Sequence, residues 1–156
     1  MKKSWIIILF FILSFYCFGA GMMDSFAMYH SWLFVGENEF SEMHQAVGKR
    51  IILIVVLPML VLTALCVLLL WHRPSAVSKR SVIAALLTLL AGWASSAFIQ
   101  IPMQVELDKG KNAALLEQLI HSDWIRVVAW LIYITIVLFM IIRLQQHYVR
   151  MARHVS

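Results

Sequence analysis

Four long apolar runs, separated by shorter polar segments, dominate the pattern of this chain. They extend from Trp5 to Ala27, from Ile51 to Trp71, from Val82 to Met103 and from Trp124 to Ile142. Each run is long enough, at about 1.5 Å per residue, to cross roughly 30 Å of hydrocarbon as a helix. None shows the alternation of apolar and polar residues that is typical of a membrane barrel strand. The pattern predicts an all-α fold, a single four-transmembrane-helix bundle over residues 1–156 with short helices in the outer loops.

Composition supports the same class. Hydrophobic residues make up 62% of the chain, charged residues make up 13%, and the mean hydropathy is +0.84. A water-soluble globule would need more polar side chains to cover its surface. The first run follows Lys2 and Lys3 and resembles a signal peptide, but its apolar part is longer than a typical signal core. We therefore expect this run to remain as a signal anchor and to form the first span.

The charged residues divide between the two sides of the predicted bundle. Basic residues cluster before the first run, in the link between the second and third runs, and after the fourth; they are Lys2, Lys3, Arg73, Lys79, Arg80, Arg143, Arg150 and Arg153. All 8 acidic residues lie on or near the opposite side. Because basic residues favour the cytoplasmic side, both termini are predicted to be cytoplasmic, in a multi-pass protein of the bacterial inner membrane.

The net charge of +5 also bears on the partners of the chain. In a soluble protein it would suggest nucleic acid, but here the basic residues flank membrane spans in short segments. This placement is better explained by topology and by anionic lipid head groups. The sequence therefore predicts membrane lipids as partners and no nucleic acid, and it leaves the oligomeric state open.

Two glutamines interrupt the outer end of the third run. Gln100 and Gln104 are four residues apart, so both side chains would lie on one face of a helix. Pro102, between them, removes a backbone donor and releases the carbonyl one turn earlier, which predicts a kinked or frayed helix. The amides would then face the inside of the bundle, where they could either bind a ligand or join neighbouring helices. The sequence alone leaves both roles open.

The two outer loops supply further candidate residues. The first is expected to contain a short helix from Glu37 to Lys49, with His44 on its inward face. The second is expected to contain a short amphipathic helix along the membrane surface around Leu115 to Ile120. Ser122 or Asp123 would then cap the fourth span. Arg126 would lie in the first turn of that span, against the helix dipole, so it should have a ligand or an acidic partner such as Asp123 or Glu106.

Histidines and acids of the outer half raise the question of a metal. His30, His44 and His121, with Glu39, Glu42 and Asp123, are residue types that bind iron, zinc or copper. The paired Glu-x-x-His motifs of di-iron bundles are absent, because Glu42 and His44 form only Glu-x-His. We therefore predict no metal site, and the sequence identifies no cofactor.

Two motifs carry a resemblance to a known family. The segment "IPMQ" at the end of the third run and "DWIRVVAW" at the start of the fourth resemble the anthrone-oxygenase-like family of small four-helix membrane proteins. Gln100 and Gln104 stand where that family commonly has asparagines, Pro102 matches its proline, and Trp124 and Arg126 resemble its later motif. The resemblance implies a divergent member, and an oxygenase or oxidoreductase that oxidises phenolic anthrones with oxygen.

Two hypotheses for function follow. In the first, the outer ends of the helices form a pocket for a phenolic or quinone-like molecule, lined by His30, His44, Gln100, Gln104, Trp124 and Arg126. His44 or His30 would take a phenolic proton as catalytic base, while the amides, Trp124 and Arg126 would bind the substrate and stabilise the oxyanion. In the second, the protein is a non-enzymatic membrane component whose polar cluster joins helices or contacts a partner. A cavity with convergent polar groups favours the first, and a packed cluster favours the second.

Overall fold

The computed structural model describes residues 2–153, with side chains from Trp5 onwards. Helices make up four long segments of it: α1 (Lys2–Met23) with α2 (Tyr29–Trp32), α3 (Glu37–Ile51) with α4 (Leu57–His72), α5 (Lys79–Ser95) with α6 (Ile101–Leu107), and α7 (Ala113–Arg153). In the first three segments a π-helical turn joins the two parts, at Asp24–Met28, Ile52–Val56 and Ser96–Gln100. All four segments are long and apolar enough to cross a membrane. The predicted all-α four-helix membrane bundle is confirmed.

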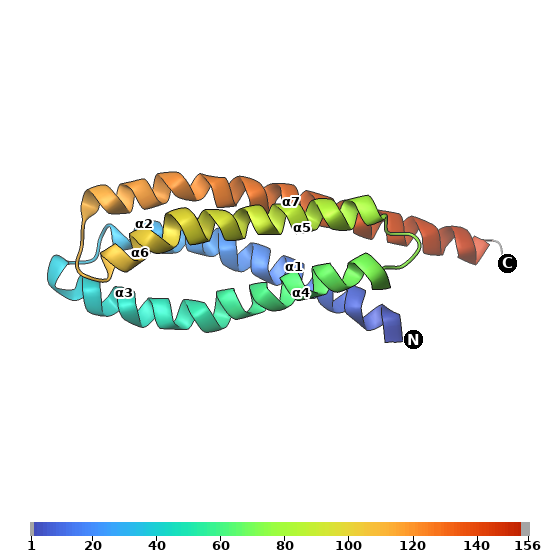
Figure 1. The fold of residues 1–156 in the computed structure, drawn as a ribbon, viewed down its shortest axis with the longest axis horizontal. Helices are drawn as coiled ribbons and strands as arrows, with labels where there is room; N and C mark the ends of the chain where they lie inside the picture. The colour runs from blue at the N-terminus through green and yellow to red at the C-terminus, as the bar shows by residue number, and fades with distance from the viewer. Residues whose placement is uncertain (1, 154–156) are drawn as a thin grey trace.

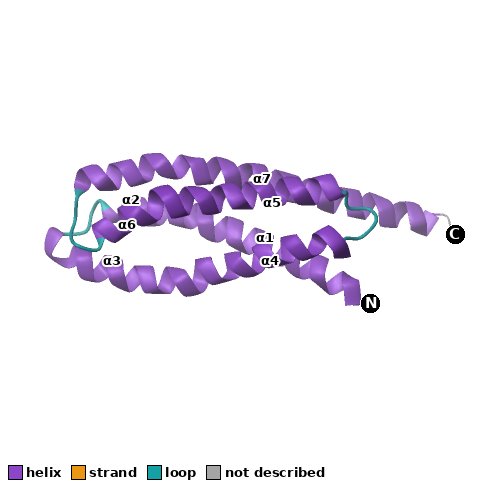
Figure 2. Ribbon diagram, in the orientation of Figure 1, coloured by secondary structure: helices purple, strands orange, loops and turns teal. Residues whose placement is uncertain are grey.

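The four segments form a closed bundle. α1 packs against α4, α4 against α5, α5 against α7, and α7 back against α1. The chain ends and the α4–α5 link lie at one end of the bundle, which we call the inner end, and the other loops lie at the outer end (Figure 1). Figure 2 shows the loops, in teal, at these two ends. The termini therefore share one side, as the charge pattern requires.

Buried apolar side chains form two separate cores. The inner core joins all four segments and consists of Ile7, Phe10, Cys17, Leu62, Leu65, Cys66, Leu69, Val77, Val82, Ala85, Leu89, Trp130, Tyr133, Ile134, Val137 and Met140. The outer core consists of Tyr29, Trp32, Phe40, Leu107, Leu116 and Leu119. Gly21 brings α1 close to α7, because a Cβ atom there would lie 2.8 Å from Trp130 Nε1. The polar cluster described below adjoins the outer core.

The fourth span begins much earlier than expected. The prediction of a separate surface helix, with a cap at Ser122 or Asp123, is wrong, because α7 is a single helix of 41 residues. Asn112 caps it instead, since its side-chain oxygen accepts a hydrogen bond from Leu115 N at 3.1 Å. Leu116 and Leu119 are buried in the outer core, and this packing holds the first turns of α7 onto the bundle. Arg126 therefore lies inside the helix rather than in its first turn.

The helix expected near Glu37 to Lys49 exists, but it is not separate. α3 continues through a π turn into α4 and so extends the second span toward the outer end. Pro58 removes the backbone donor that would bind the Ile54 carbonyl. The Tyr16 hydroxyl donates to that carbonyl at 2.8 Å. A hydroxyl from α1 thus satisfies a backbone acceptor that proline leaves open in a span that faces lipid.

Candidate functional site

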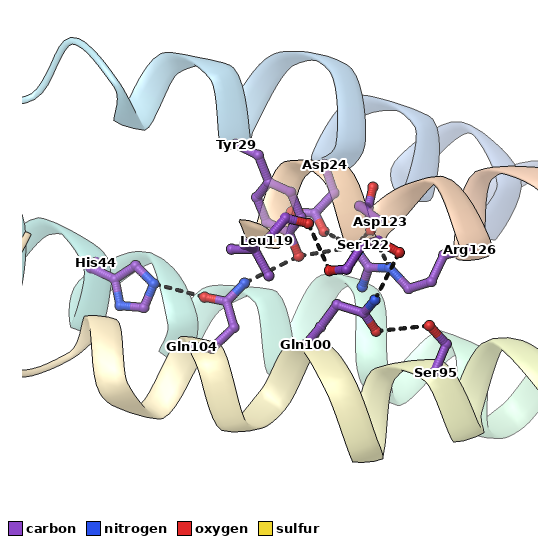
Figure 3. Close-up of polar contacts among 10 residues, drawn as sticks. All are labelled: Asp24, Tyr29, His44, Ser95, Gln100, Gln104, Leu119, Ser122, Asp123 and Arg126. Atoms are coloured by element: carbon purple, nitrogen blue, oxygen red, sulfur yellow. Dashed lines mark hydrogen bonds and ion pairs between the residues drawn. The ribbon is translucent and has the colours of Figure 1, made fainter. Parts of the chain in front are cut away.

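An ion cluster around Arg126 lies between α7 and the end of the first span. The Arg126 guanidinium donates from Nε to Asp123, one turn earlier on α7. Its Nη2 lies 3.2 Å from Asp24 Oδ2 and donates to Tyr29 Oη at 2.9 Å (Figure 3). Both carboxylates are buried. Arg126 thus has the acidic partner expected for it at Asp123, whereas Glu106 pairs with Lys109.

The π turn at Asp24–Met28 places Asp24 and Tyr29 on the same side of the first span. The Tyr29 amide donates to the Asp24 carbonyl, an i→i+5 bond. In an α-helix, residues five apart are rotated by roughly 140° about the axis, and only one of them could face Arg126. The wider turn stacks them, so both reach the guanidinium. This local geometry creates the site.

A second chain of hydrogen bonds leads from Tyr29 to the outer surface. Gln104 Nε2 donates to Tyr29 Oη at 3.1 Å, and Gln104 Oε1 lies 2.7 Å from His44 Nε2 (Figure 3). His44 Nδ1 lies 2.7 Å from Asp108 Oδ1, whose side chain is 44% exposed. Gln104 Oε1 is an amide oxygen and Asp108 Oδ1 a carboxylate oxygen, so both contacts of His44 are to acceptor atoms. The chain joins the partly buried Arg126 to an exposed carboxylate.

Aromatic rings fix the orientation of His44. The Phe40 ring stacks on the imidazole at 5.5 Å between centroids, and the Trp32 ring meets it edge-on at 4.8 Å. Tyr29 in turn packs against Trp32 at 5.1 Å. His44 is therefore held by apolar contacts of the outer core as well as by its hydrogen bonds.

Gln100 donates a hydrogen bond to the backbone of α7 rather than to the Arg126 cluster. Its side chain is 1% exposed, accepts a hydrogen bond from Ser95 Oγ at 3.1 Å and donates to the Ser122 carbonyl at 3.3 Å. Ser95 and Gln100 are five residues apart, and the π turn at Ser96–Gln100 brings them together. As expected, both glutamines face the inside of the bundle, and the helix is distorted next to Pro102, which lies two residues after the end of the π turn.

The structure brings together four of the six residues predicted to line the site. His44, Gln100, Gln104 and Arg126 lie in or beside the polar cluster (Figure 3). His30 is exposed, and Trp124 is 54% exposed and packs edge-on against Phe26 at 5.7 Å. Neither is within the hydrogen-bonded cluster of the described residues.

Three members of the cluster, Asp24, Tyr29 and Asp108, were not among the predicted site residues. Asp123 was expected as a helix cap or as the acidic partner of Arg126. At 3.6 residues per turn, Asp24 and Tyr29 would lie on different faces of the helix. Sequence periodicity therefore could not show that a π turn brings them together. Asp108 had no signal beyond its place in a polar loop.

The space beside the cluster is small. A cavity of about 10 Å³ adjoins Arg126 and is lined on its inner side by Gly92, Trp130 and Tyr133. That is about the volume that one water molecule needs. No buried side-chain nitrogen or oxygen of the described residues lacks a hydrogen-bond partner. The cluster is thus closed and internally satisfied in this conformation.

The donor set gives little support to a metal ion. Within residues 2–153 no three histidine, cysteine or acidic side chains are grouped so that they could hold one. His44 faces Asp108 and Gln104, and His121 is exposed.

Comparison of the chain with protein-family models, with curated proteins and with solved structures found no match.

Proposed function

We propose that this integral membrane protein binds the oxygen-bearing head group of a phenolic or quinone-like molecule at the polar cluster. One observation carries the proposal: the cluster already holds a phenol oxygen, that of Tyr29. Arg126 Nη2 and Gln104 Nε2 both donate to it, at 2.9 Å and 3.1 Å. A ligand oxygen that displaced Tyr29 would meet the same two donors, one of them charged.

The position of the cluster supports the same class of ligand. Ionisable side chains inside membrane spans are costly, and they usually mark a place where a substrate or a proton is handled. Phenols and quinones with apolar rings partition into lipid, so they would reach the cluster through the bundle wall. The exposed Phe26 and Trp124 pair lies on that wall beside Asp123 and offers aromatic contacts to a planar ring.

Residue roles follow from these contacts. Arg126 and Gln104 would bind the ligand oxygen and stabilise negative charge on it. His44 reaches the Tyr29 oxygen only through Gln104, so we assign it the role of positioning the amide rather than of taking the proton. Oxidation of the ligand by oxygen rests on the resemblance of "IPMQ" and "DWIRVVAW" to the anthrone-oxygenase-like family alone.

A second function, a purely structural one, is favoured by a different observation. Every buried polar side-chain atom of the described residues is already satisfied, and the adjoining cavity has room for about one water. Such a cluster would hold α7 against the first and third segments without binding anything.

Ligand titration separates the two functions. The full chain in lipid nanodiscs is titrated with a naphthohydroquinone and, as a matched ligand without oxygens, with tetralin. We expect saturable binding of the hydroquinone only, and roughly tenfold weaker binding in Gln104→Leu, which removes one neutral donor. Gln118→Leu, on the exposed face of α7, is the control and should bind like the unchanged chain.

The absence of saturable binding, or equal affinity for the two ligands, would leave the structural function. In that case Gln104→Leu would lower only the stability of the bundle. Absorption spectra and metal analysis of the purified protein provide a second readout, because a quinone that co-purifies with the unchanged chain should be depleted in the variant.

A further inference from the structure

A second site lies at the inner end, far from the polar cluster. A cavity of about 400 Å³ opens between the α4–α5 link, the start of α5 and the last third of α7. Figure 1 shows the link, in green, lying over the red part of α7 at the end that carries both termini. The residues that line the cavity include Ser78, Arg80, Ser81, Phe139, Met140 and Arg143. The volume is within the range of small-molecule sites.

The cavity is cationic, and none of the described residues that line it is acidic. Arg80 projects from α5 and Arg143 from α7, and both are exposed. The 8 acidic residues of the chain all lie between Asp24 and Glu42 or between Glu106 and Asp123, in the outer half. No ion pair with Arg80 or Arg143 occurs within residues 2–153. Two guanidinium groups thus share one cavity without an internal counter-ion.

Hydroxyl groups supply further donors. Ser78 caps α5, because its Oγ accepts from Ser81 N at 3.0 Å, and the two hydroxyls are 2.8 Å apart. The first backbone bond of the helix runs from Val82 N to the Ser78 carbonyl. Arginine pairs and hydroxyls converging on one space are the groups that bind phosphate oxygens.

The floor of the cavity is apolar. Val77 and Met140 are each 1% exposed, and the half-exposed Phe139 ring lies under Arg143, with 4.8 Å between Cζ and the ring centroid. A free phosphate ion has no apolar part that could contact this floor. A phospholipid has one: its phosphate would meet the arginines, while its glycerol and upper acyl carbons would contact the floor and the lipid-facing side chains above it.

We propose that this cavity binds the phosphate head group of an anionic phospholipid, held by Arg80 and Arg143 from two different helices. The lipid would join the start of α5 to α7 at the membrane surface. The proposal is independent of any ligand at the polar cluster.

Native mass spectrometry of the full chain, released from micelles that contain phosphatidylglycerol or phosphatidylcholine, tests the proposal. We expect one phosphatidylglycerol to bind more tightly than phosphatidylcholine. The double variant Arg80→Gln, Arg143→Gln should weaken it by roughly 25-fold, about fivefold for each arginine. The control, Lys79→Gln with Arg150→Gln, removes the same charge from the same two helices at positions that do not line the cavity.

Each outcome decides the matter. Loss of binding confined to the arginine pair supports the site, provided that both double variants unfold at the same temperature in phosphatidylcholine. Equal weakening by the two double variants would reduce the effect to general surface charge and overturn the proposal. Competition by millimolar inorganic phosphate, without any preference between the lipids, would identify a free anion as the ligand and overturn the lipid assignment.

Discussion

The two halves of the bundle use the same helices but different interactions. The inner core is built from apolar side chains, and its buried contact between two polar side chains is a neutral one, the Ser14–Tyr133 hydroxyl pair at 2.7 Å. The outer half instead buries Asp24 and Asp123 around Arg126 and connects them through Tyr29 and Gln104. Lipid is as apolar as leucine, so the inner half gains mainly from close packing. The outer half depends on complete pairing of charges.

The largest effect is expected at Arg126. Arg126→Leu leaves Asp24 and Asp123 buried without their cation, and we expect a loss of about 3–5 kcal/mol in the free energy of unfolding. Reversible unfolding in mixed detergent and SDS micelles measures it. Arg150→Leu, at an exposed position of the same helix, should stay within about 0.5 kcal/mol.

A triple variant sharpens this prediction. Asp24→Asn, Asp123→Asn and Arg126→Leu together remove all three charges, so most of the lost stability should return. A triple variant as unstable as Arg126→Leu would mean that the lost packing of the arginine, rather than the unpaired charge, causes the damage.

The stability of the inner half should depend on the volume of its buried side chains. Leu62 is 0% exposed in the inner core, and Leu62→Ala should cost about 2–4 kcal/mol through lost contacts and the cavity that remains. The same unfolding titration measures it. Leu60→Ala, at a position 54% exposed toward lipid, is the matched control, and a loss equal to that of Leu62→Ala would contradict the packing argument.

A smaller effect is expected at His44. His44→Phe keeps a ring between Phe40 and Trp32 but removes the bonds to Gln104 and Asp108, at a cost of about 1–3 kcal/mol. Thermal unfolding in nanodiscs reports the change. His121→Phe, on the exposed face of α7, should be nearly neutral. If His44→Phe also left the stability unchanged, the bonds of His44 would make no contribution to the stability of the bundle.

The smallest effect is expected at Tyr133. Tyr133→Phe removes only the hydroxyl that pairs with Ser14, and bonds of this kind between membrane helices contribute about 0.6 kcal/mol on average. Tyr148→Phe, at an exposed position, is the control. A loss above about 2 kcal/mol would show that the inner half also depends on polar pairing.

The fold could be predicted from the sequence because it follows from composition and run length. Long apolar runs have few alternatives to helices in lipid, since each backbone group must be satisfied within its own segment. The extent of α7 was missed for a physical reason: Leu116 and Leu119 were assigned to the membrane surface, but they pack into the outer core instead. Amphipathic periodicity alone does not distinguish these two environments.

The candidate site was predictable only in part. Gln100, Gln104 and Arg126 stood out because polar groups in apolar runs are rare. Tyr29 did not, because its link to Asp24 depends on a π turn that a 3.6-residue period cannot express. His44 could be placed on an inward face, but its partner Asp108 lies 64 residues further along the chain.

The π turns also give the outer half a tolerance to one change in chain length. Each holds about one residue more than an α-helical turn. Deleting one residue between Asp24 and Tyr29 would leave these two residues four apart, a spacing that an α-helix places on one face, within roughly 40°. Such a deletion should therefore return the first span to a regular α-helix in which the carboxylate and the phenol still face Arg126. A deletion elsewhere in α1 has no extra residue to remove and would rotate everything beyond it by roughly 100°.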